Sequence, residues 1–381
     1  MTKKYMRRVI VGVVALALIA LIAWAHSYVS PMTPRASREW SRGRVIGRTP
    51  VSRPVALRPA PDEGVLLIWP NPEGRLELAH IGADGEVLLN RVLPVGAETA
   101  RDPQLQVGLD GRLHLLWREM EEPHAAIHYV MLSADGTSVG QPQVLSDPTR
   151  WAEGAPRLAL DPAGRLHALW ADEVGIQWAM LSAEGTLLEG PVLLVPEGRF
   201  PAVQVDNHRQ LHLAWQQWIG RNTRGIYYSV FDPESGETSE PEEIALVFQR
   251  TGQRIEGPTL GLDAETGYVL WSALDVREVS SRGQYAFFPL DLPWQKRINA
   301  LRLEEGRNPS GMHALEGQRT PLLVALSETV GEGWEAEPQI AVVAVAQGRM
   351  PEYEVWGLAR ATNGGRRAFP VLAQQAVGPP R

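Results

Sequence analysis

Short apolar segments of five to nine residues recur along most of the chain, and each is bounded by Asp, Gly or Pro. Five of them end in a tryptophan, at Trp69, Trp117, Trp170, Trp215 and Trp271. The spacings between these tryptophans are 48, 53, 45 and 56 residues, and a weaker copy (RTPLLVAL) puts Leu326 at the matching place 55 residues further on. Segments of this length, rich in Val, Leu, Ile and aromatic residues between turn residues, predict β-strands.

Each repeat carries the same order of parts. A proline-led segment comes first, and an Asp-containing turn (Asp110, Asp161, Asp206, Asp263) leads from it into the tryptophan segment. A variable loop follows, then a third apolar segment such as IHYVMLSADG from Ile127, and a fourth such as PVLLV from Pro191. Four short antiparallel strands in a unit of about 50 residues, repeated about six times, predict a β-propeller.

The predicted fold is therefore all-β, with six four-stranded antiparallel blades over residues 54–381 and seven blades as the alternative count. Apolar residues stand on both sides of the strands, as Leu115 and Leu116 do, which suits blades buried on both faces. Residues 43–53 are similar to a fourth-strand segment and could close the last blade. The tail at 368–375 is similar to a first strand.

The amino terminus predicts a membrane-spanning helix. Four basic residues within residues 1–8 precede an uncharged apolar run over 9–25, at the short end of what spans a bilayer. As a signal anchor, it leaves residues 1–8 in the cytoplasm and places the propeller on the extracytoplasmic side of the cell membrane. As a cleaved signal peptide, it would be processed at Ala23-Trp24-Ala25. We expect the anchor, followed by a basic, Pro-containing linker over 26–53.

Charge and composition exclude several classes of function. Residues 1–53 hold ten Lys or Arg and one acid, whereas the rest holds 27 basic and 43 acidic residues. A body this acidic does not suit nucleic-acid binding, which needs clustered Lys and Arg. The chain has no cysteine, which excludes disulfides, Cys-ligated metals and thiol catalysis.

The repeat resembles the sialidase-type propellers with BNR or Asp-box repeats. The likeness covers roughly residues 54–360 and is carried by the LHxxW segments, the aromatic third strands and the turn with Ser133, Asp135 and Gly136. The family's Asp box is Ser-x-Asp-x-Gly-x-Thr-Trp, whereas this chain has one residue fewer between Ser and Gly and no following Trp. The resemblance implies a propeller fold, and none of the family's catalytic residues has a counterpart here.

Candidate binding residues gather in the loops that enter each first strand. These loops and the second-to-third connections share one end of a propeller, where ligands usually bind. Converging guanidinium groups there would suit a carboxylate, sulfate or phosphate, and loop tryptophans would offer an aromatic platform. The alternatives are solvated arginines that bond to the backbone and tryptophans that pack beneath their own loops. The candidates are Arg101, Arg150, Trp151, Arg199, Trp218, Arg254 and Arg307.

Catalytic and metal signals are missing from the sequence. The histidines of LHxxW (His114, His167, His212) lie at one position of successive blades, too far apart to share an ion, so we expect packing or hydrogen-bonding roles and no metal site. No nucleophile elbow, phosphate loop or dinucleotide fingerprint occurs, and we expect no cofactor.

These features favour a membrane-anchored extracytoplasmic propeller that acts as a non-catalytic module, with a carbohydrate, a peptide or an envelope protein as its partner. One alternative is a sialidase-like glycoside hydrolase. The other is a scaffold subunit of an envelope complex, held through its blade rims.

Overall fold

The computed structural model describes Leu18 and residues 56–60, 65–71, 73–81, 87–96, 99–121, 124–137, 140–249, 253–262, 265–275, 280–301, 308–315, 322–330 and 336–344. The chain divides into two compact units, residues 1–44 and 45–381, and all the strands belong to the second unit.

Six antiparallel sheets follow one another along the second unit. Sheet 1 contains β1 (Ala56–Pro59), β2 (Val65–Pro70), β3 (Leu76–Ile81) and β4 (Val87–Val92). Sheet 2 contains β5 (Ala100–Val107), β6 (Leu113–Glu121), β7 (His124–Leu132) and β8 (Gln143–Val144). Sheet 3 contains β9 (Glu153–Leu160), β10 (Leu166–Ala171), β11 (Gly175–Leu181) and β12 (Leu187–Pro196).

The remaining three sheets vary this plan. Sheet 4 contains β13 (Arg199–Val205), β14 (Leu211–Gly220) and β15 (Thr223–Asp232), and both β16 (Glu237–Thr238) and β17 (Glu242–Phe248) pair with β15. Sheet 5 contains β18 (Gln253–Leu262), β19 (Thr266–Asp275), β20 (Ser280–Pro289) and β21 (Arg297–Leu301), with the 3₁₀ turn η1 (Pro293–Gln295) before β21. Sheet 6 contains β22 (Asn308–Leu315), β23 (Leu322–Val330) and β24 (Ala336–Ala344).

The predicted order of parts is confirmed. All five repeat tryptophans lie in the second strand of their sheets, and Leu326 lies in β23, the second strand of sheet 6. The prolines that lead the first segments lie in first strands, as Pro103 does in β5. The all-β architecture is therefore the one that the repeat predicts.

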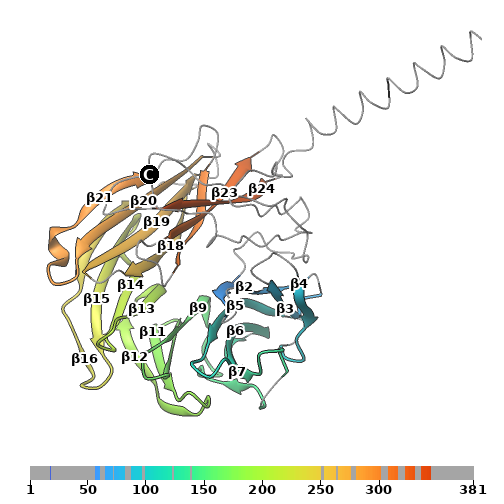
Figure 1. Ribbon diagram of the computed structural model, residues 1–381. Helices are drawn as coiled ribbons and strands as arrows, with labels where there is room; N and C mark the ends of the chain where they lie inside the picture. The colour runs from blue at the N-terminus through green and yellow to red at the C-terminus, as the bar shows by residue number, and fades with distance from the viewer. Residues whose placement is uncertain are drawn as a thin grey trace, which may run out of the picture. The chain divides into compact units, whose positions relative to one another are not determined.

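Consecutive sheets pack through their first strands and their faces. β1 lies against β5, β5 against β9, β9 against β13, β13 against β18, and β18 against β22 (Figure 1). Separate hydrophobic clusters fill the spaces between sheets 1 and 2, 2 and 3, 3 and 4, and 4 and 5. The opposite face of sheet 1 is buried too, at Val65, Leu67 and Trp69. Sheets that cover both faces of their neighbours in this way give a propeller-like arrangement.

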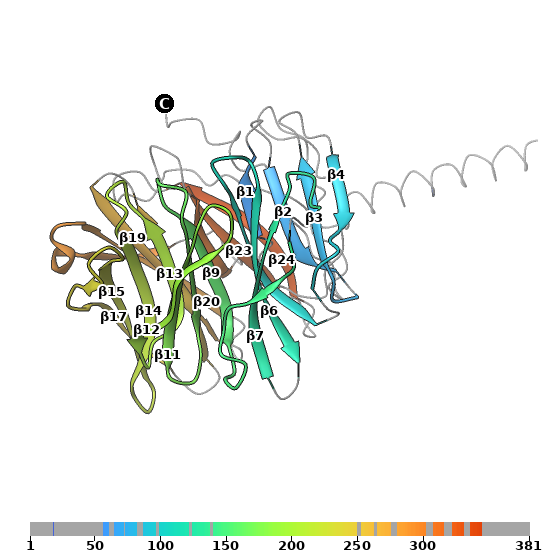
Figure 2. The same cartoon turned by 90° about the horizontal axis from the view of Figure 1, so that it is seen from below.

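Two ends of the sheets carry different connections. We call the end with the entries to the first strands and the second-to-third connections the mouth face. The opposite end, with the first-to-second and third-to-fourth turns, is the turn face. Figure 2 shows β14, β15 and β17 of sheet 4 side by side, running between these two ends.

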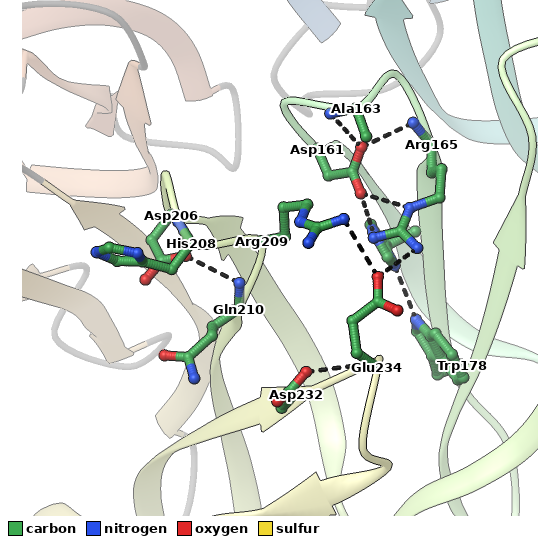
Figure 3. Close-up of polar contacts among 11 residues, drawn as sticks. Asp161, Ala163, Arg165, Trp178, Asp206, His208, Arg209, Gln210, Asp232 and Glu234 are labelled. Carbon is green, nitrogen blue, oxygen red and sulfur yellow. Dashed lines mark hydrogen bonds and ion pairs between the residues drawn. The ribbon is translucent and has the colours of Figure 1, made fainter.

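Aspartate side chains close the first-to-second turns. Asp161 Oδ1 accepts hydrogen bonds from the amides of Ala163 (2.9 Å) and Arg165 (2.8 Å), and Asp206 Oδ1 accepts from those of His208 and Gln210 (both 2.8 Å) (Figure 3). Such Asx turns explain why Asp recurs where a strand must reverse.

The turn of sheet 2 contains its predicted aspartate at a different position. Asp110 Oδ1 accepts a hydrogen bond from the Arg112 amide at 3.0 Å. In sheet 3 two backbone hydrogen bonds close the turn, from Asp161 N to Arg165 O and from Gly164 N to Asp161 O. In sheet 2 the corresponding bonds run from Gly108 N to Arg112 O and from Gly111 N to Gly108 O. Gly108 therefore occupies the aspartate position. A Cβ there would lie 2.8 Å from His114 Nε2, so the imidazole takes the space where a side chain would begin.

The recurrent histidines form buried polar chains, which confirms the expected hydrogen-bonding role. His114 Nδ1 lies 2.7 Å from the Tyr129 hydroxyl, and His212 Nδ1 lies 2.6 Å from that of Tyr228. In sheet 3 the partner is Trp178, whose indole N–H donates to His167 Nδ1 at 3.3 Å.

The indole fixes the tautomer of His167. Because an indole nitrogen can only donate, the proton of this imidazole is on Nε2. That atom faces Asp161 Oδ2 at 3.6 Å. In sheet 4, His212 Nε2 faces Asp206 Oδ2 at 3.4 Å. Burial lowers the pKa of His114 to about 4 and also lowers that of His212, so both imidazoles are neutral at pH 7.

Ion pairs on the turn face join sheets 3 and 4. Arg165 binds Asp161 of its own turn at 2.7 Å and reaches Glu234 of the next sheet, also at 2.7 Å (Figure 3). Arg209 approaches the same Glu234 carboxylate at 3.4 Å. Asp161 is fully buried, which acts to raise the pKa of its carboxyl. The nearby imidazole of His167 and the hydrogen bonds and charge of Arg165 outweigh this and hold that pKa well below the usual range.

Several sequence predictions lie outside the described residues. They are the segments 1–8, 26–53 and 368–375, and the membrane-spanning helix over 9–25 except for Leu18, which is helical. Within the described part of the chain, no helix combines the length and the apolar character needed to cross a membrane.

The neutral histidines predict acid sensitivity of the fold. The unfolded chain binds protons at His114 near pH 6.5, whereas the folded chain does so only near pH 4, so this residue's contribution is complete above pH 6.5 and is lost as the pH falls towards 4. Replacing both partners, in the His114→Phe/Tyr129→Phe double variant, should reduce the slope of unfolding free energy against pH in this window by up to about 1.4 kcal/mol per pH unit. Urea unfolding measured between pH 7 and pH 4 checks this.

The exposed His208 supplies the control. The His208→Phe variant should keep the wild-type slope. A double variant with the wild-type slope would contradict the assignment of a neutral, buried His114.

Candidate functional site

A β-bulge recurs where the first strands of sheets 2 to 5 leave the mouth face. The pairing shifts between Arg101 and Gln104 in β5, between Arg199 and Ala202 in β13, and between Glu256 and Thr259 in β18. In β9 it shifts beside Pro156. Each shift spans the leading proline of its segment, because proline has no N–H to donate to the neighbouring strand. Bulges of this kind turn side chains away from the regular pleat.

Backbone strain accompanies the bulges. Asp102, Gly154 and Phe200 have φ angles of 51°, 67° and 52° at or next to corresponding positions of three successive first strands. Positive φ is costly for a bulky side chain such as that of Phe200, and it persists only where the surroundings enforce it.

The surroundings of Phe200 are two glycines from the neighbouring sheets. A Cβ on Gly154 of sheet 3 would lie 3.2 Å from Phe200 Cδ1, and one on Gly257 of sheet 5 would lie 2.5 Å from Phe200 Cβ. The phenylalanine is thus wedged between first strands that have no side chains at the points of contact, and its own side chain is partly exposed. This contact could not be predicted from the sequence, because it joins three repeats.

Ion pairs connect the mouth-face loops of sheets 2, 3 and 4. Arg118 binds Asp102 at 2.7 Å, and both side chains are largely buried. Arg118 also donates to the carbonyl oxygen of Ala152 in the next sheet, at 3.4 Å. Arg199 makes a similar link between sheets 4 and 3. It binds Glu153 Oε2 at 2.9 Å and donates to the carbonyl oxygen of Glu173 at 3.0 Å.

Arg150 binds carboxylates on both sides. Its guanidinium lies 3.6 Å from Asp147 and 3.4 Å from the buried Asp172. Asp172 Oδ1 is already occupied, since it accepts from the amides of Val174 (3.0 Å) and Gly175 (3.2 Å) and from the side chain of Gln177 (3.3 Å).

Trp151 is a packing residue of its loop. Its amide donates to Glu173 Oε1 at 2.7 Å, and it pairs with Ala125 in an isolated bridge. The partly buried ring packs against the core between sheets 2 and 3. Trp151 thus fits the alternative in which a loop tryptophan packs beneath its own loop.

Trp218 has a different environment near the tip of the β14–β15 hairpin, where its side chain is 48% exposed. The guanidinium carbon of Arg224 lies 4.1 Å from the centre of the indole, a cation–π contact. Arg224 Nη1 donates to the buried Gln216 at 2.9 Å. Strand pairing explains the cluster, because Trp218 is directly opposite Arg224 and Gln216 is two residues back on the same sheet face.

The predicted residues therefore separate into groups. Arg150 and Arg199 lie on the mouth face in ion pairs, and Arg101 donates to the carbonyl oxygen of Ala100 at 2.8 Å. Only the backbone of Arg254 is described, within β18, and Arg307 lies outside the described residues. Their role in binding a ligand stays a prediction.

Sequence reasoning missed Arg118, Asp102, Phe200, Gln216 and Arg224. One signal was available for Arg224. In the segment WIGRNTR a short turn separates two strands, so an arginine six residues after the tryptophan falls opposite it.

Among the described residues, no group of three or more His, Asp or Glu side chains is arranged to hold a metal ion.

Comparison with known proteins concerns the fold. Neither the models of known protein families nor the curated proteins searched match the sequence. A polysaccharide lyase, an ulvan lyase, superposes with a TM-score of 0.56 at 11% identity, over 85% of this chain and 87% of its own. The same kind of lyase bound to -[GlcA(1-4)Rha3S]- gives 0.53 at 10% identity, with the same coverage.

A protein of unknown function from Dyadobacter fermentans gives a TM-score of 0.51 at 11% identity, over 78% of this chain and 97% of its own. At identities this low the likeness establishes a β-propeller-like fold and no chemistry. The finer resemblance to the sialidase type stays a prediction.

The wedge of Phe200 between two glycines predicts a specific mutational coupling. Gly257→Ala should destabilise the protein by roughly 1–3 kcal/mol, since the new methyl group meets Phe200 Cβ. Phe200→Gly removes that atom and tolerates positive φ, so Gly257→Ala should cost less in the Phe200→Gly background. A double-mutant cycle of urea unfolding measures the coupling.

Gly140→Ala is the control, because a Cβ on Gly140 meets nothing within 4 Å. It should change stability by less than about 0.5 kcal/mol. Additive effects of Gly257→Ala and Phe200→Gly would contradict the wedge.

Proposed function

We propose that this protein is a membrane-anchored, six-bladed β-propeller that binds carbohydrate at its mouth face, on the extracytoplasmic side, without catalysing a reaction. The main support for this proposal is Trp218, whose half-exposed indole lies on paired strands at the mouth face. Sugar rings stack on exposed aromatic faces because both surfaces are apolar and flat, and surrounding polar groups then orient the hydroxyls.

The hairpin offers the other parts of such a site. Gln216 and Arg224 flank Trp218 with hydrogen-bonding groups. The hairpin is built on β14 and β15, and β17 pairs with β15 as far as Thr223, so the platform stands on a sheet rather than on a loop. A rigid support of this kind reduces the entropy that binding costs.

The structural neighbours support a carbohydrate ligand over a peptide. The ulvan lyase with a TM-score of 0.56 is a polysaccharide lyase. The lyase structure with a TM-score of 0.53 contains -[GlcA(1-4)Rha3S]-, a repeat of a uronic acid and a sulfated sugar. The present chain shares the fold with these lyases at low identity. We therefore take only the class of ligand, a carbohydrate, from this comparison.

The state of the acidic residues favours binding over catalysis. A glycosidase needs a pair of carboxyl groups free to act as acid and as nucleophile or base. On this mouth face Asp102 is engaged by Arg118. Asp172 is engaged by two amides and a side-chain amide. Glu119 accepts from the Trp117 indole at 3.1 Å. These groups maintain loop geometry.

Loss of the platform should abolish binding. The Trp218→Ala variant of the full-length chain, purified in detergent, should bind at least about tenfold more weakly to whichever sugars of a glycan array retain the wild type. Trp294→Ala is the matched control, since this indole is 59% exposed in η1, on the turn face. Equal losses for both variants would contradict a mouth-face site, and turnover of a glycoside by the wild type would favour the hydrolase.

The membrane proposal rests on the apolar run over 9–25 and is tested separately. Alkaline phosphatase fused after Arg381 should be active, because it matures only after export. The full-length chain should stay in the membrane fraction after an alkaline carbonate wash, and a chain lacking residues 1–25 should not. A mature protein that begins after Ala25 would show a cleaved signal peptide instead.

A further inference from the structure

Arg224 is a partly buried arginine whose contacts within the described residues include no carboxylate, unlike several arginines of sheets 2 to 4. Arg118, Arg150, Arg165, Arg199 and Arg209 each bind at least one carboxylate. Arg224 has no carboxylate partner among the described residues. Its hydrogen bond goes to the neutral side-chain oxygen of Gln216, and its Nε is buried without a partner.

This arrangement is costly for the protein alone. Burial lowers the pKa of Arg224, the direction expected when a cation loses water without gaining an anion. A buried cation is normally paired, because the attraction of a counter-ion offsets the loss of hydration. The hairpin from Gln216 to Gly225 contains Arg221 as a second cation and no Asp or Glu.

The geometry prepares the guanidinium for a planar anion. The Trp218 indole covers one face of the group at 4.1 Å, and Gln216 holds one of its terminal nitrogens. Nε is buried, so a ligand can reach only the two terminal nitrogens. Arg224 Nη2 makes no hydrogen bond within the described part of the chain, and Nη1 keeps a second N–H beside the one that Gln216 accepts. A fork of N–H donors fixed in one plane suits the paired oxygens of a carboxylate or sulfate.

We propose that Trp218, Arg224 and Gln216 form a subsite for an acidic sugar, whose ring stacks on the indole and whose carboxylate or sulfate pairs with the guanidinium of Arg224. The inference rests on the proposed carbohydrate binding and narrows it to anionic glycans. The sequence predicted an anionic group or a carbohydrate as a ligand and Trp218 as a binding residue, whereas Arg224 and Gln216 were not predicted.

The test uses the full-length chain in detergent with four polymers. They are polygalacturonate, which carries carboxylates, dextran sulfate, neutral dextran, and polyglutamate as an acidic peptide. The wild type should bind one or both of the anionic polysaccharides at least about tenfold more tightly than dextran, and more weakly as the salt concentration rises. Calorimetry measures the affinity, and the preferred polymer identifies the anionic group.

Two charge-removing variants separate a specific contact from general attraction. Arg224→Gln should weaken binding of the acidic polysaccharide at least about tenfold, the loss of a charge-assisted pair. Arg221→Gln removes the same charge from an exposed position three residues away, and it should change the affinity by less than about twofold. Arg224→Lys keeps the charge but loses the planar fork, so its affinity should fall between the two.

Thermal unfolding shows whether Arg224→Gln remains folded. Because the variant removes an uncompensated cation, it should melt no lower than the wild type. The polysaccharide should raise the Tm of the wild type and of Arg221→Gln, and it should leave that of Arg224→Gln unchanged.

The outcomes distinguish this inference from the proposed function. Equal losses for Arg224→Gln and Arg221→Gln, or equal affinity for dextran and the anionic polymers, would overturn the acidic subsite and leave carbohydrate binding intact. Polyglutamate bound as tightly as the polysaccharides would replace the sugar with an acidic peptide. Failure to bind any polysaccharide, charged or neutral, would remove the carbohydrate function itself.

Discussion

Face-to-face packing of the sheets is the constraint on which the rest of the structure depends. A sheet of four short strands with apolar residues on both faces cannot bury them alone, so each sheet is stable only between neighbours. The described clusters fill the successive spaces from sheet 1 to sheet 5. This packing fixes where the strand ends lie, and so it brings connections from different repeats to the same mouth face.

Polar groups inside the sheets follow the same constraint. The histidines of the second strands are buried, and the Nδ1 atom of each shares a hydrogen bond with an aromatic residue of the third strand of its own sheet. That aromatic residue also reaches the next sheet, since Trp178 packs edge-on against Phe231 with ring centres 5.0 Å apart, and Tyr228 packs against Phe288 at 4.7 Å. The same aromatic side chain therefore makes a hydrogen bond within its own sheet and packs against the next sheet.

The sequence was sufficient for features that repeat. Strand order, buried tryptophans and the roles of the histidines follow from a pattern that recurs five or six times, and each copy supports the others. Features that depend on a single copy were not predictable. In the turn of sheet 2 the backbone position of Asp161 belongs to Gly108, and Asp110 lies two residues further on, which residue types alone do not indicate. Arg224 is distinguished by having no carboxylate partner among the described residues, and a sequence does not show which carboxylates are out of reach.

The wedge at Phe200 has a consequence for how such a chain can change over time. Repeat proteins are often pictured as interchangeable units that duplication and exchange can reorder. Here the third unit and the fifth each present a glycine to the aromatic ring of the fourth. A copy of the fourth unit placed beside the second would meet Arg101 and Asp102 before the leading proline, where the fifth unit has Gly257. The residues at these contacts in the first strands therefore fit one order of the units. The units repeat in sequence, yet they are not interchangeable.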